Sequence, residues 1–109
     1  MASDPATVRF AVEQMAGAGV LRHAPMFGEY GVWCDGKLVA LVCDDQLYLK
    51  PTAGAVALLP DLPMGPPYRG AKPTVMADAL LDDPALLVRA VAQIVADLPE
   101  PKPKKPRKT

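Results

Sequence analysis

Side chains that could carry out covalent chemistry are few in this chain of 109 residues. It has one histidine, His23, one serine, Ser3, two cysteines and no asparagine. A triad of serine, histidine and acid would need its nucleophile at the third position of the chain, which argues against this kind of hydrolysis. Cys34 with His23 stays open as a nucleophile and base, although a cysteine in an apolar strand is more often a small core residue. We therefore expect no catalytic residues and no enzyme activity.

Metal, cofactor and nucleotide sites have equally little support. One histidine and no Cys-x-x-Cys pair do not make a metal site. The acidic pairs Asp44-Asp45 and Asp82-Asp83 fit a turn and a helix cap better than paired catalytic carboxylates. The segment Gly31–Lys37 has the glycine and lysine spacing of a phosphate-binding loop. Leu38, however, replaces the Ser/Thr that would hold magnesium, and the lysine begins a strand instead of a helix. The sequence predicts no cofactor.

The segment around Cys34 must be positioned by an antiparallel meander. Asp35-Gly36 is typical of a two-residue hairpin turn, and Asp44-Asp45 predicts a second one. Pairing across the two turns sets Cys34 opposite Lys37, Val32 opposite Val39, Tyr30 opposite Leu41, Leu41 opposite Tyr48, and Val42 opposite Leu47. Because side chains alternate, one face gathers Trp33, Leu38, Ala40, Val42, Leu47 and Leu49. The other face gathers Tyr30, Val32, Cys34, Val39, Leu41, Cys43, Tyr48 and Lys50.

Both faces of this meander are largely apolar. We expect helices to cover the face with Trp33 and the leucines, so the second face needs another cover. The sequence therefore predicts a partner face at Tyr30, Val39, Leu41 and Tyr48, covered by a second copy in a homodimer or by another protein. The same register separates Cys34 from Cys43 by about 20 Å along the strands, so both should be free thiols.

Two helices should flank the meander. Asp4 and Pro5 begin the first, and Asp83 and Pro84 begin the last, in each case an N-cap followed by proline at the first helical position. The apolar stripe of the first helix is Val8, Ala11, Val12 and Met15. The stripe of the last helix is Leu87, Val91, Ile94, Val95 and Leu98.

The segment between the meander and the last helix is rich in proline. Pro51–Pro73 contains six prolines and predicts a loop, with at most one helical turn over Ala53–Leu59. Tyr68 and Val75–Leu80 supply one or two further strands. The predicted fold class is α+β, a two-layer antiparallel sheet with N-terminal and C-terminal helices.

Length and charge predict one domain with a basic tail. The chain can form one core, residues 1–99, and the segment 100–109 is expected to be disordered. Residues 1–100 hold seven Lys/Arg and twelve Asp/Glu, a net charge of −5, whereas Pro101–Thr109 carries five cations and no acid. We expect a cytoplasmic protein, because the chain has neither a membrane-length apolar run nor a signal peptide. The residues for weak contact with nucleic acid or another polyanion are Lys102, Lys104, Lys105, Arg107 and Lys108.

One stretch of the meander carries a family resemblance. The runs MFGEYGV from Met26, CDGK from Cys34, ALV from Ala40 and DQLYLK from Asp45 are similar to the N-terminal domain of the TfoX/Sxy family. The resemblance implies the order α-β-β-β-α-β-β-α, as in type III secretion chaperones. It also implies a regulator linked to natural competence, a coactivator of transcription that acts with a DNA-bound partner. Fuller members carry a second, helical domain, so we expect a stand-alone N-terminal domain here.

Three functional hypotheses follow. The first is a non-enzymatic regulatory or adaptor protein that works through protein contacts. The second is an enzyme or small-molecule binder that uses the proline-rich loop around Tyr68 and Arg69, which a deep closed pocket at Cys34, His23 or Arg69 would favour. The third is direct nucleic-acid binding through the tail.

Overall fold

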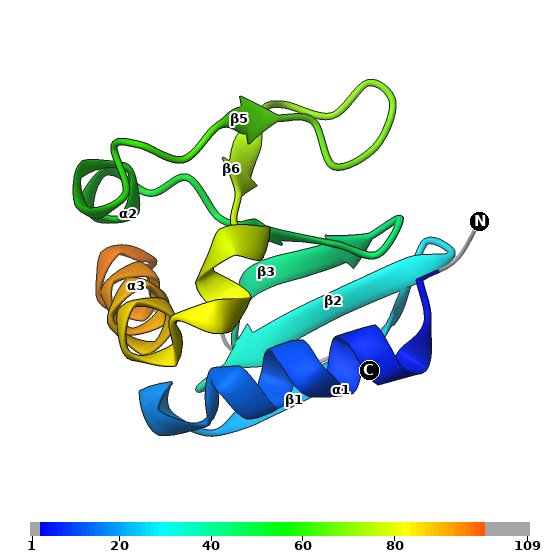
Figure 1. The fold of residues 1–109 in the computed structure, drawn as a ribbon, viewed down its shortest axis with the longest axis horizontal. Coiled ribbons are helices and arrows are strands. Elements are labelled where there is room, and N and C mark those ends of the chain that lie inside the picture. Colours follow the sequence, from blue (N-terminus) through cyan, green and yellow to red (C-terminus); the bar gives the residue numbers. More distant parts are fainter. Residues whose placement is uncertain (1–2, 100–109) are drawn as a thin grey trace, which may run out of the picture.

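A computed structural model describes residues 3–99 of the chain, and Figure 1 shows their arrangement. One antiparallel sheet packs against a layer of helices. The helices are α1 (Pro5–Gln14), α2 (Ala53–Leu58) and α3 (Pro84–Asp97), with 3₁₀ turns η1 (Ala16–Ala18) and η2 (Asp78–Asp82). The strands are β1 (Leu21–Met26), β2 (Glu29–Cys34), β3 (Lys37–Cys43), β4 (Gln46–Leu49), β5 (Met64–Gly65) and β6 (Thr74–Met76). None of the helices in residues 3–99 is long and apolar enough to cross a membrane.

The sheet has the strand order β1-β2-β3-β4-β6-β5, and every neighbouring pair is antiparallel. This confirms the α+β class with N-terminal and C-terminal helices. Four strands precede α2, one more than the family order implied, because Phe27-Gly28 is a tight turn that separates β1 from β2. Phe27 and Gly28 both have positive φ, 51° and 83°. The two expected turns, at Asp35-Gly36 and Asp44-Asp45, have the same signs of φ, which is typical of type I′ hairpins.

The two long helices begin where their capping residues predict. The Asp4 side chain accepts a hydrogen bond from the Ala6 amide, and the Asp83 side chain accepts one from the Leu86 amide. The expected apolar stripes face the sheet. The fully buried members of the first stripe are Val8 and Ala11 in α1 and Met15 directly after it. Those of the last stripe are Leu87, Val91 and Ile94 in α3.

A β-bulge in β3 changes which residues face the helices. Trp33 pairs with Leu38, but Val32 pairs with Ala40, so Val39 is an extra residue between the two pairs. The expected pairings of Val32 with Val39 and Tyr30 with Leu41 are therefore wrong by one residue. The pairings across the second turn, with Leu41 opposite Tyr48, are confirmed.

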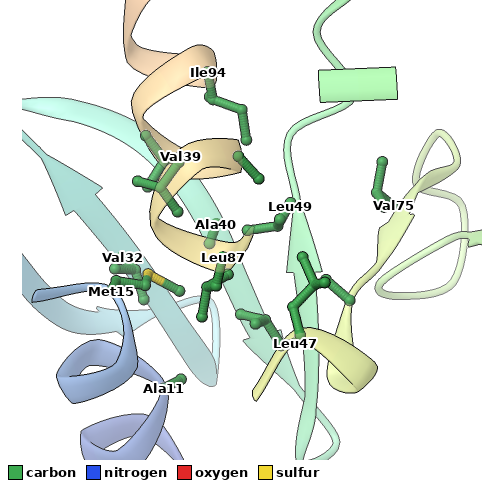
Figure 2. Packing of buried hydrophobic residues seen from close by; sticks show 14 of the residues in the cluster. Ala11, Met15, Val32, Val39, Ala40, Leu47, Leu49, Val75, Leu87 and Ile94 are labelled. Atoms are coloured by element: carbon green, nitrogen blue, oxygen red, sulfur yellow. The ribbon is translucent and has the colours of Figure 1, made fainter. Parts of the chain in front are cut away.

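The bulge gives the core a different composition from the expected one. Val39 and Ala40 both point to the helix layer, as Figure 2 shows, together with Val32 and Leu49. The predicted sorting is correct for the second half of β3 and for β4. It is wrong for β2 and the start of β3, where Val32, Cys34 and Val39 are fully buried in the core while Trp33 and Leu38 are only half-buried.

The proline-rich segment is more ordered than expected. α2 fills the position where at most one helical turn was predicted, and the Thr52 hydroxyl caps it by accepting from the Ala55 amide. The further strands are β5 and β6, so the expectation that Tyr68 lies in a strand is wrong. The expected last strand, Val75–Leu80, is too long, because residues 78–80 belong to η2 instead. The basic tail and its five cations lie outside the described residues.

Candidate functional site

The face of the sheet opposite the helices, called here the open face, is apolar along its centre. Trp33, Leu38, Leu41 and Tyr48 follow one another across β2, β3 and β4. The Trp33 ring lies over the backbone of Gly31, where a Cβ atom would come within 2.8 Å of the ring. On its other side the ring meets the Arg22 guanidinium, whose carbon is 4.3 Å from the ring centroid. Such contacts fix the tryptophan at one end of the open face.

The proline-rich loop between β5 and β6 overhangs the open face, and two cavities lie between them. One cavity has a volume of about 370 Å³ and is lined by strand residues together with Pro67, Ala71, Lys72 and Pro73 of the loop. The other has a volume of about 360 Å³ and extends to the turn between β1 and β2. Both are lined by Met26, Leu41 and Tyr68, so they form one continuous groove, called here the open-face groove.

The structure changes the membership of the expected partner face. Val39 is wrong as a member, because the bulge turns it into the core, where none of its surface is exposed. Leu41 forms the floor shared by both cavities. Tyr48 lies on the open face but is largely covered by the overhanging loop, and Tyr30 is half-buried, packs against the core and lines the second cavity. The loop thus supplies part of the cover that was expected from a second molecule.

Phe27 is a surface residue that the sequence did not single out. It lines the second cavity, yet its side chain is 96% exposed, and its φ of 51° is a left-handed value that aromatic residues rarely adopt. Tyr68, which lines both cavities, is 58% exposed. The signal in the sequence was Gly28, which follows Phe27 between two strand-like runs and marks a turn.

A polar clasp joins the N-terminus to the same end of the sheet. The Ser3 amide and hydroxyl both donate to Glu29 Oε1 at 2.8 Å, and the Asp44 amide donates to Glu29 Oε2 at 2.7 Å. The Asp45 amide donates to the Ser3 hydroxyl, and the Asp4 amide donates to Asp45 Oδ1. The chain's one serine is therefore a buried residue whose hydroxyl both donates to Glu29 and accepts from Asp45.

The chemistry of Glu29 reflects this clasp. Burial raises the pKa of its carboxyl, but the hydrogen bonds from Asp44 and Ser3 outweigh burial and hold the pKa below the ordinary value of 4.5. The carboxylate form is thus the one that the fold stabilises. Both of its oxygens already accept hydrogen bonds within the chain.

The candidate catalytic side chains are not brought together. His23 pairs with Val32 and Cys34 pairs with Leu21, an offset of two residues or about 7 Å along the strands. Both cysteines are buried free thiols, as expected. Burial raises the pKa of both thiols. The negative charges of Asp35 near Cys34, and of Glu29 and Asp44 near Cys43, raise the pKa further. Both effects lower the fraction of reactive thiolate. Among residues 3–99 no three His, Cys, Asp or Glu side chains form a metal-binding group.

The segment that resembles a phosphate-binding loop is the β2–β3 hairpin. Lys37 Nζ donates to the carbonyl oxygens of Val95 and Leu98, at 2.8 and 3.0 Å, and so stabilises the end of α3. Neither cavity of the open-face groove is lined by His23, Cys34 or Arg69. The geometry that would have favoured an enzyme at those residues is not found in the described part of the chain.

Comparison with known proteins places this fold in a family. The model of the TfoX N-terminal domain matches residues 13–98, so the chain belongs to the TfoX N-terminal domain family. A protein of Spirochaeta aurantia, described as an uncharacterized 12.7 kDa protein in the trpE 5' region, is 34% identical over 105 residues. That alignment covers 96% of this chain and 91% of the relative.

Proposed function

We propose that this protein is a non-enzymatic regulatory or adaptor protein that acts in transcription, as in the TfoX/Sxy family, and binds another protein or a second copy of itself through the open face. The observation that carries the proposal is Phe27. Its aromatic ring is 96% exposed to water, which is unfavourable for an apolar side chain. Its left-handed backbone conformation is also unfavourable for a phenylalanine. A partner that buries the ring would compensate for both.

The surroundings of Phe27 support the same interpretation. The ring lines the second cavity of the open-face groove together with Tyr68, another exposed aromatic residue. Interfaces are enriched in aromatic anchors next to grooves that exclude water. The clasp of Glu29 holds the adjacent turns in place, so the anchor is presented by a rigid support.

Site-specific photocrosslinking in the native cell tests this function. A benzoylphenylalanine at position 27 should yield one discrete crosslinked species, which mass spectrometry identifies as a second copy or another protein. The matched control is position 10, because Phe10 is 45% exposed but belongs to α1. Equal crosslinking from both positions, or none from position 27, would contradict the proposal.

A small-molecule function is the second candidate, and the volume of the groove favours it. Each cavity, at 360 to 370 Å³, lies in the range of about 300 to 1,000 Å³ typical of ligand pockets. Polar side chains are few along the groove, as in most such sites. This candidate is developed below, because the charged residues of the groove indicate a ligand class.

A further inference from the structure

The charged groups of the open-face groove are not evenly distributed. In the first cavity the charged lining residues are Lys50 and Lys72, one at the end of β4 and one on the overhanging loop. No acidic residue lines that cavity. The floor and walls between the two lysines and Phe27 are apolar or aromatic, formed by Leu38, Leu41 and their neighbours.

The acidic residue of the second cavity does not balance these cations. Glu29 lines that cavity, but its two oxygens accept three hydrogen bonds from Ser3 and Asp44. Within residues 3–99, neither Lys50 nor Lys72 has an acid within ion-pair distance. The groove therefore combines an apolar channel with an end where both charged lining residues are cations, a charge pattern complementary to an anion.

From this arrangement we propose that the open-face groove binds a small amphipathic anion, with its apolar chain over Leu41 and its carboxylate at Lys50 and Lys72. An apolar body satisfies the floor, and one anionic head group satisfies the two ammonium groups. The inference does not rest on the proposed adaptor function, because binding is measured on the protein alone. A partner at Phe27 would meet the filled groove and could sense its occupant.

The test is calorimetric titration of the full-length protein with three amphiphiles of equal chain length, each kept below its micelle concentration. Decanoate is the anionic probe, decyl maltoside the neutral one and decyltrimethylammonium the cationic one. We expect decanoate to bind the most tightly and the cation the most weakly. Equal or tighter binding of the neutral probe would overturn the proposal, as would the absence of decanoate binding.

Two pairs of substitutions locate the site. Replacing both groove lysines, Lys50→Gln with Lys72→Gln, should weaken decanoate binding about five- to thirtyfold and leave the neutral probe unchanged. The matched control removes the same number of cations from the helix layer, Arg9→Gln with Arg89→Gln, both of which are exposed. An equal loss in the control pair would show an unspecific charge effect and overturn the assignment.

A substitution on the floor separates the apolar contribution. Leu41→Gln should weaken all three probes, because Leu41 lines both cavities. Circular dichroism on each variant shows whether it is folded, and only folded variants are compared. If light scattering shows a dimer in which decanoate cannot compete for the groove, the occupant is a second copy and the proposal is wrong. Crosslinking from position 27 can succeed or fail independently of these results.

Discussion

At the residue scale, several polar side chains of the described residues stabilise turns through hydrogen bonds. Ser3 and Glu29, which a search for catalytic groups would select, bond to each other and to the turn at Asp44. Asp35 accepts from the Val20 amide at 2.9 Å and fastens the other end of the meander in the same way. Charge-assisted hydrogen bonds of this kind are worth more than neutral ones because the acceptor is ionised.

Replacing Glu29 by glutamine should therefore destabilise the fold. We expect the free energy of unfolding at neutral pH to fall by about 1 to 2 kcal/mol in urea titrations, since the ionised acceptor for three hydrogen bonds is lost. Glu13→Gln, an exposed carboxylate on α1, is the control and should change little.

The stabilising contribution of the Glu29 carboxylate should also depend on pH, and the direction of that dependence follows from its pKa. Because the pKa of Glu29 is lower in the folded protein than its ordinary value of 4.5, its stabilising contribution is fully present above that value. The contribution is lost as the pH falls through the lower pKa of the folded state. The stability difference between the protein and Glu29→Gln should shrink in acid, and a constant difference down to full protonation would contradict this account.

A substitution of Phe27, in contrast, is expected to stabilise the fold. Phe27→Asn is expected to raise the free energy of unfolding by about 1 kcal/mol, because asparagine tolerates the left-handed φ of 51° and suits the first position of a type I′ turn. Phe27→Ala removes the exposed ring but keeps the unfavourable φ, so it should not stabilise. Thermal melts of the three proteins measure this; equal stabilisation by alanine would show that the ring and not the backbone is responsible.

At the element scale, the bulge in β3 decides the two faces of the sheet. One extra residue puts Val39 in the core and leaves Leu41 over the groove, although the two are separated by only two positions. A regular hairpin would place both on the same face. The bulge, and not the residue type, thus determines whether an apolar residue of β3 lies in the core or lines the groove.

Alanine at the two positions measures the difference. Val39→Ala should cost about 2 kcal/mol of stability, because it removes fully buried methyl groups and leaves a cavity. Leu41→Ala removes more carbon atoms but from a half-buried position, so it should cost only about 1 kcal/mol. Chemical denaturation that gave the reverse order would argue against the bulged register.

At the scale of the whole molecule, the described body, residues 3–99, is built around one hydrophobic core. Its core connects both long helices with all of the central strands, and the end of α3 is bonded to the sheet through Lys37. The basic tail lies outside the described residues, and we expect it to contribute polyanion contact and not stability.

Deleting residues 102–109 tests this separation. The melting temperature should stay within about 2 °C of the full-length value, since a change below about 0.5 kcal/mol moves it little in a domain of this size. Retention on a heparin column should decrease if the five cations provide polyanion contact. Unchanged retention would remove nucleic-acid binding through the tail from consideration.

Much of the fold could be predicted from local signals. Asp4-Pro5 and Asp83-Pro84 mark the starts of the long helices, and Asp35-Gly36 marks the central hairpin, because capping and turn geometry depend on a few adjacent residues. The family resemblance in the same meander was also sufficient to predict the family to which the chain belongs. The turn at Phe27-Gly28 was missed because phenylalanine contradicts the usual preference for that position.

The sequence by itself determined the two long helices, the two expected hairpin turns, the free thiols and the family. Only the tertiary structure decided which apolar residues form the core and which line the open-face groove. The physical reason is that a bulge shifts the strand pairing by one residue. Because side chains alternate between the two faces, this shift moves each following side chain to the other face. Since no local preference marks Val39 as the extra residue, the packing of α1 and α3 against the sheet is needed to select it, and with it the face that is left for binding.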